Sequence, residues 1–157
     1  MSQDFDFQIG SWRVTHRRLR ERLVGSTDWE TFTGTITMRP VLGGSGNIED
    51  NVLHISTGTY RAIAIRSFDP ALKTWVIWWL DHRNPHALDV PVIGRFVDGV
   101  GTFTAVDTSG DRPVHVRFLW LQTDTSTPRW EQAMSLDGGE TWETNWTMDF
   151  ERASADG

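Results

Sequence analysis

The sequence contains no cysteine, so neither disulfide bonds nor cysteine-ligated metal sites can stabilise the fold. It also lacks any run approaching the roughly 20 apolar residues of a membrane-spanning helix, and its first residues, MSQDFDFQIG, do not resemble a signal peptide. Basic residues are fewer than acidic ones, and the resulting net charge of −6 disfavours a polyanionic partner. We therefore expect a cytoplasmic protein that binds neither nucleic acid nor a membrane.

Helical periodicity is missing as well. No segment repeats its apolar residues at the helical period of roughly 3.6, and no internal repeat is visible. Instead, about nine or ten short runs alternate apolar and polar residues and are separated by brief turns. The pattern predicts an all-β fold, and the short connections favour a closed antiparallel up-and-down barrel, because closure leaves no exposed edge strand. We expect one domain over residues 1–153 and a disordered tail at residues 154–157.

The N-terminal segment predicts a plug for one end of the barrel. Residues 4–10 carry Phe5, Phe7 and Ile9 at period two, so we expect these side chains to be buried, on a short strand or on one turn of 3₁₀-helix. The next strand places Trp12, Val14 and His16 on one face. A single histidine on an inward face is more often a hydrogen-bonded structural residue than a ligand, and this is what we expect for His16.

Residues 129–150 predict a β-hairpin with a well-defined turn. Two alternating runs flank Asp137-Gly138-Gly139, and Asp-Gly pairs supply the positive φ angles that a tight hairpin needs. The turn fits the pattern Ser-x-Asp-x-Gly-x-Thr-Trp and resembles the Asp-box hairpin of sialidases and many unrelated β-proteins. In such a hairpin the aspartate binds loop N–H groups and the tryptophan packs beneath it. The resemblance assigns structural roles to Ser135, Asp137, Gly139 and Trp142.

Pairing the hairpin about its glycines gives an expected register. It places Glu131 opposite Trp146 and Gln132 opposite Asn145, so that a carboxylate lies among apolar groups. A buried carboxylate needs a partner, and Arg117 on the preceding strand shares its face under a simple pairing. Two interpretations stay open, namely a structural ion pair and a polar anchor for a ligand. A slip of one residue would exchange the partners.

The longest stretch without a clear period is residues 82–91, HRNPHALDVP, which follows a tryptophan-rich strand. Loops of this kind at a barrel mouth often carry function, although a plain connection is an equal alternative. His82 and His86 are spaced for metal binding only on a helix, and Pro85 argues against one, so no metal site is predicted. The candidate ligand-binding residues are Trp79, His82, Arg117, Glu131, Asn145 and Trp146.

The motif Gly10-Ser11-Trp12 resembles the start of the first strand in the lipocalin and calycin superfamily. Together with FDFQIGSWRVTHRRL, FDPALKTW, PVIGRF and the terminal hairpin, it looks like an uncharacterised bacterial family of calycin-like proteins, with similarity over almost the whole chain. The resemblance implies a barrel with a pocket, and a stacking contact between Arg152 and Trp12. It brings no catalytic residue. Haem is disfavoured as a cofactor, because Arg13-Val14-Thr15 replaces the glycine-rich extension of the haem-binding branch.

Nine tryptophans beside a single tyrosine suit either a filled core or a stacking site for a ligand. Our leading hypothesis is a non-enzymatic protein that binds a small hydrophobic or amphipathic molecule inside the barrel. One alternative is an enzyme acting on a hydrophobic small molecule, with Glu131 or His82 as general acid or base. Another is a packed structural module that forms a homodimer through tryptophan-rich outer faces.

Overall fold

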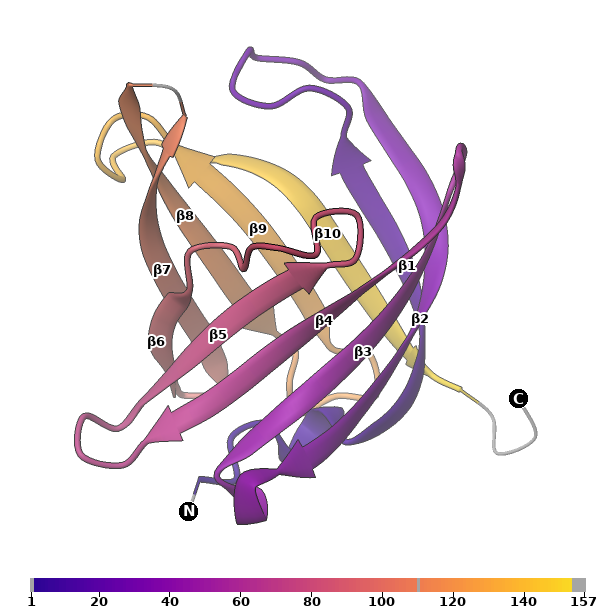
Figure 1. Cartoon of the computed structure of the whole chain (residues 1–157), viewed down its shortest axis with the longest axis vertical. Helices are drawn as coiled ribbons and strands as arrows, with labels where there is room; N and C mark the ends of the chain where they lie inside the picture. Colours follow the sequence, from indigo (N-terminus) through magenta and orange to yellow (C-terminus); the bar gives the residue numbers. More distant parts are fainter. Residues whose placement is uncertain (1, 110, 154–157) are drawn as a thin grey trace.

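The computed structural model describes residues 2–109 and 111–153, which form a closed antiparallel up-and-down β-barrel (Figure 1). Each strand pairs with its neighbours in sequence, and β10 returns to pair with β1. The predicted fold class is thereby confirmed; the predicted tail at residues 154–157 lies outside the described residues. The strands are β1 (Gly10–Leu19), β2 (Trp29–Val41), β3 (Gly46–Ile55), β4 (Gly58–Asp69), β5 (Thr74–Asp81), β6 (Val92–Val97), β7 (Val100–Ser109), β8 (Arg112–Leu121), β9 (Arg129–Ser135) and β10 (Glu143–Arg152).

Alternation along the strands determines which side chains face the interior. In β2, Phe32, Ile36 and Met38 are buried, whereas the intervening threonines are exposed. β-Branched threonine suits the outer face of a half-buried strand, so sequence and burial agree here. The described residues contain no helix that is long and apolar enough to cross a membrane.

The N-terminal segment closes one end of the barrel, as expected. A 3₁₀-helix, η1 (Asp6–Gln8), follows Phe5, whose ring lies edge-on to Trp75 and Phe96 at centroid distances of 4.9 and 5.0 Å. Phe5 and Gln8 are buried and Phe7 is half-buried, but Ile9 is 38% exposed, so the expected burial is wrong for Ile9. Ile9 lies between the end of η1 and the start of β1 and so belongs to the buried face of neither element.

The predicted contact between Arg152 and Trp12 is confirmed. The guanidinium carbon of Arg152 lies 3.8 Å from the centre of the Trp12 ring, and the two residues pair across β1 and β10. Arg152 also donates hydrogen bonds to the carbonyl oxygens of Phe7 and Ile9. The indole N–H of Trp12 donates to the carbonyl oxygen of Gln8 at 2.9 Å. These contacts hold the plug in the end of the barrel.

A buried polar network joins the plug to the barrel interior. Arg66 of β4 forms an ion pair with Glu49 of β3, and its Nη1 donates to Gln8 Oε1 at 2.6 Å and to Asn47 Oδ1 at 3.1 Å. Its guanidinium carbon lies 4.4 Å from the centre of the Phe5 ring. A charge buried this deeply is tolerated only when it is paired and hydrogen-bonded, so these residues depend on one another.

The turn between β9 and β10 has the predicted Asp-box arrangement. Asp137 accepts hydrogen bonds from Ser135 Oγ at 2.6 Å and from the backbone N–H of Thr141 at 2.9 Å, and Ser135 Oγ accepts the N–H of Gly139. The bond from Ser135, reinforced by those from Thr141, holds the pKa of Asp137 well below its usual range. The Trp142 indole donates to the Gly139 carbonyl oxygen at 3.0 Å. Gly139 has a φ of +94°, which favours glycine.

The seam between β5 and β6 is the shortest in the barrel. The two strands pair only over Trp75–Gly94, Val76–Ile93 and Ile77–Val92. The end of β5, from Trp78 to Asp81, extends beyond β6 and is covered on that side by residues 82–91. Two backbone hydrogen bonds join this loop to the strand: the N–H of Asp89 donates to the Trp79 carbonyl oxygen at 3.0 Å, and the N–H of Asn84 donates to the Asp81 carbonyl oxygen at 2.9 Å.

The buried ion pair gives a testable prediction of stability. Replacing Arg66 with methionine is expected to lower the free energy of unfolding by about 3–5 kcal/mol, because Glu49 is left charged and unpaired in the interior. The double variant Glu49→Leu/Arg66→Met is expected to recover part of this loss, as no buried charge remains. Urea denaturation of the two variants and the parent measures the difference. A double variant less stable than Arg66→Met alone would contradict this account.

Candidate functional site

The end of the barrel opposite the plug contains a cavity of about 190 Å³. For comparison, an engineered protein cavity of about 150 Å³ holds benzene. The end of β1, the start of β4 and the end of β5 contribute polar groups to its rim, and β5, β8, β9 and β10 contribute aromatic walls. The lining residues are Arg18, Arg22, Tyr60, Trp79, Asp81, Arg83, Asp89, Phe118, Trp130, Gln132 and Trp146.

The inner part of the cavity is an aromatic cage. Trp146 lies edge-on to Trp79 and to Trp130, at centroid distances of 5.9 and 5.3 Å and interplanar angles of 87° and 88°. Phe118 lies 5.0 Å from Trp130 at 71°. Such edge-to-face packing is the favoured geometry of aromatic pairs, and it leaves ring faces available for stacking on a flat ligand.

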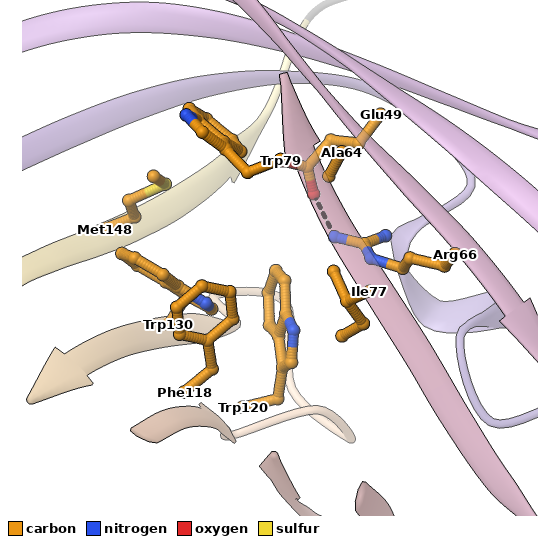
Figure 2. Close-up of a pocket in the computed structure, with 9 residues that line it drawn as sticks. All are labelled: Glu49, Ala64, Arg66, Ile77, Trp79, Phe118, Trp120, Trp130 and Met148. Carbon is orange, nitrogen blue, oxygen red and sulfur yellow. Dashed lines mark hydrogen bonds and ion pairs between the residues drawn. The ribbon is translucent and has the colours of Figure 1, made fainter. Parts of the chain in front are cut away.

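A smaller space of about 20 Å³ lies deeper in the barrel, between the cage and the buried ion pair. It shares Trp79, Phe118 and Trp130 with the outer cavity. Figure 2 shows Phe118, Trp120 and Trp130 on one side of this space, with Ile77 and the paired Arg66 and Glu49 on the other. The shared aromatic side chains therefore separate the open mouth from the polar network that holds the plug.

His16 fixes the position of one cage wall. The Trp146 indole N–H donates to Nδ1 of His16 at 3.0 Å, and Phe32 stacks on the imidazole at 4.6 Å with an interplanar angle of 11°. Burial, followed by the nearby charge of Arg18, lowers the pKa of His16 from 6.5 to about 3. The imidazole is therefore neutral, with its proton on Nε2. The expected structural role of a hydrogen-bonded His16 is confirmed.

Arg18 connects the cage to the charged rim. Its Nη1 donates to the Tyr60 hydroxyl at 2.8 Å, and its Nε and Nη2 both lie 3.3 Å from Glu30 Oε1. The guanidinium carbon lies 4.8 Å from the ring centre of Phe32 and 4.9 Å from that of Trp146. The rings of Phe32 and Trp146 and the hydrogen bonds to Tyr60 and Glu30 together hold the Arg18 guanidinium in one orientation beside the cavity.

A second rim arginine is committed to a carboxylate. Arg83 donates from Nε and Nη2 to both oxygens of Asp81, with a shortest distance of 2.7 Å, and its guanidinium carbon lies 3.5 Å above the Tyr60 ring. Asp89 is the other acidic group of the lining. Burial, then the neighbouring charges of Asp107 and Asp81, raise its pKa above the usual range.

Arg22 differs from the other two arginines. It lies in the loop between β1 and β2, which the backbone N–H of Leu23 anchors by donating to Glu143 Oε1 at 2.6 Å. Within residues 2–109 and 111–153, the Arg22 guanidinium makes neither a hydrogen bond nor an ion pair. The rim therefore offers one cation whose hydrogen-bonding groups are uncommitted.

Two of the predicted site residues, Trp79 and Trp146, line the cavity. Asn145 lies behind it, where its Oδ1 accepts a hydrogen bond of 2.8 Å from Gln132 Nε2 and so orients the Gln132 amide. His82 is exposed and does not line the cavity; its Nδ1 accepts the backbone N–H of Arg61 at 2.8 Å. The sequence thus identified two cage walls and one residue that supports the lining.

The predicted register of Glu131 with Trp146 is wrong. The hairpin pairs as expected as far as Ala133 with Thr144, but a β-bulge at Asn145 then shifts the pairing by one residue. Gln132 consequently pairs with Trp146 and faces the cavity, while Glu131 pairs with Thr147 on the outer face. There Glu131 forms an ion pair with Arg129 at 2.8 Å. The carboxylate is structural and lies outside the lumen.

Arg117 shares a face with Glu131, as expected, but it is the outer face, and there Glu131 pairs with Arg129 instead of Arg117. Arg117 lies between the inward-facing Val116 and Phe118 and therefore points outward, where its guanidinium carbon is 4.4 Å from the centre of the Trp142 ring. It packs under the Asp-box turn. Arg117 supports the β9–β10 turn and does not line the cavity.

The sequence reasoning missed the arginines and Tyr60 of the rim. Arg18 could have been found, because it lies two residues after His16 and thus shares the inward face of β1. The curvature of the barrel and two loops bring Arg22, Tyr60 and Arg83 to the rim. No local sequence pattern indicates that these three residues lie close together.

The buried imidazole gives a prediction for pH dependence. Because the pKa of His16 is about 3 in the fold and near 6.5 when exposed, the unfolded chain binds more protons between these values. The free energy of unfolding should fall as the pH drops below 6.5, by up to about 1.4 kcal/mol per pH unit from this group. His16→Gln should remove that component in urea titrations at several pH values. The exposed His86→Gln is the control, and an equal effect of both substitutions would contradict the assignment.

Comparison with known proteins does not assign the chain to a family. No protein-family model matches the chain, and no match is found among curated proteins. The resemblance to calycin-like proteins accordingly stays a prediction, and the functional argument that follows depends on the geometry of the cavity.

Proposed function

We propose that this chain is a binding protein for a small amphipathic molecule with a flat aromatic part, which occupies the mouth cavity. The observation that carries the proposal is the asymmetry of the lining: an aromatic cage lies on the inside, and hydrogen-bonding groups lie at the rim. Ligand sites generally combine mostly apolar walls with a few placed polar groups. The volume of about 190 Å³ suits one ring with a short polar substituent.

Binding is favoured over catalysis by the contacts of the titratable groups. Glu131 and His82, the candidate general acids or bases, do not line the cavity. Asp81 of the lining is occupied by Arg83, and the neutral His16 accepts the Trp146 indole N–H behind the wall. The alternative of a barrel packed solid by its tryptophans is disfavoured by the cavity itself, since five aromatic side chains, three of them tryptophans, line it.

Site-resolved NMR with benzyl alcohol as the probe tests this proposal. The indole N–H signals of Trp79, Trp130 and Trp146 are expected to shift on titration, because these rings line the cavity. Those of Trp29 and Trp142, outside the barrel, should not shift. Phe118→Trp, which fills the cage, is expected to weaken binding about tenfold through overpacking.

The matched control is Leu119→Trp, on the opposite face of the same strand, which should leave the affinity unchanged. Shifts confined to the outer tryptophans, or equal effects of the two substitutions, would refute a site in the mouth of the barrel.

A further inference from the structure

We infer that the ligand of the mouth cavity is an aromatic carboxylate, with its ring in the cage and its carboxylate at Arg22 and Arg18. This inference rests on the proposed function and deepens it. The hydrogen-bonding groups of the lining that no other residue occupies are mostly donors.

The acidic groups of the lining offer little to a cationic ligand. Both oxygens of Asp81 already accept hydrogen bonds from the Arg83 guanidinium, and Oδ1 accepts the Arg83 backbone N–H as well. Asp89 has a raised pKa, so the structure favours its neutral form more than that of an ordinary aspartate. No other carboxylate lines the cavity within the described part of the chain.

The basic groups of the lining, in contrast, keep hydrogen-bond donors that no described residue accepts. A guanidinium carries five N–H donors, and Arg22 uses none of them on a described residue. Arg18 uses Nε, Nη1 and Nη2 once each, towards Glu30 and Tyr60, so each of its terminal nitrogens keeps a second N–H. The surplus of donors over acceptors matches a group that only accepts, and a carboxylate is the acceptor that guanidinium recognises best.

The position of these donors fixes the orientation of the ligand. Arg18 packs on the outer side of the cage, with its guanidinium 4.9 Å from the centre of the Trp146 ring, so a carboxylate at Arg18 directs an attached ring towards Trp79 and Trp130. The Tyr60 hydroxyl and Glu30 hold the guanidinium in place before the ligand arrives. A preorganised cation loses little side-chain entropy on binding, which strengthens recognition.

Calorimetric titration with three probes of matched shape tests the inference: benzoate, benzyl alcohol and benzylammonium, at an ionic strength that screens long-range attraction. Benzoate is expected to bind at least about tenfold more tightly than benzyl alcohol, because hydrogen bonds to charged groups are worth more than neutral ones. Benzylammonium is expected to bind most weakly.

Two substitutions are expected to change the affinity for benzoate in opposite directions. Arg22→Gln should weaken benzoate binding about tenfold and leave benzyl alcohol unchanged. Asp89→Asn should strengthen benzoate binding, because Asp89 repels a carboxylate whenever it is ionised. The control is Arg20→Gln, which makes the same change of charge in the same region but at a residue that pairs with Asp28 and Glu30 and does not line the cavity.

The outcomes separate the two proposals. Equal affinities for benzoate and benzyl alcohol, or equal effects of Arg22→Gln and Arg20→Gln, would overturn the carboxylate inference and leave the binding function standing. Tighter binding of benzylammonium would overturn it in favour of a cationic ligand. Failure of all three probes to bind would overturn the proposed function together with the inference.

Discussion

The ion pair between Arg66 and Glu49 is the interaction on which the two ends of this barrel depend. Neither charge is stable alone in the interior, and Gln8 of the plug supplies one of the remaining acceptors. The plug is thus held by polar contacts from within, and by the Arg152 contacts from outside. Because the plug closes this end, the cavity with the aromatic cage lies at the opposite end of the barrel.

The aromatic layer between the ion pair and the mouth has two functions at once. On its inner side, Trp79, Phe118 and Trp130 border the space beside Arg66 and Glu49, and on its outer side the same residues form the cage (Figure 2). Burial of the charges and formation of the cavity therefore use the same side chains. A substitution in this layer will affect stability and binding together, which is why the outer-face controls are needed to distinguish them.

The sequence predicted the fold well because strand alternation and turn chemistry are local properties. The burial of β2, the Asp-box turn and the plug, expected as a short strand or a 3₁₀ turn, were found this way. The Arg152–Trp12 contact was expected from the resemblance to calycin-like proteins instead. Glu131 was misplaced because a single bulge at Asn145 reverses the faces of everything beyond it in the hairpin, and no residue pattern announces that bulge. The Glu49–Arg66 pair and the arginine rim were missed because they unite strands and loops far apart in the sequence.

The short seam between β5 and β6 gives this barrel a preferred place to open. The free energy needed to separate two strands grows with the backbone hydrogen bonds between them, and here the paired stretch ends at Ile77 and Val92. Trp79 and Asp81, which line the cavity, follow directly on the same strand. The paired stretch lies at the plug end, where Trp75 of β5 and Phe96 of β6 pack on Phe5. The mouth half of β5 has no β6 partner, so the two strands can part at the mouth, and let a ligand enter from the side, while the plug end stays intact.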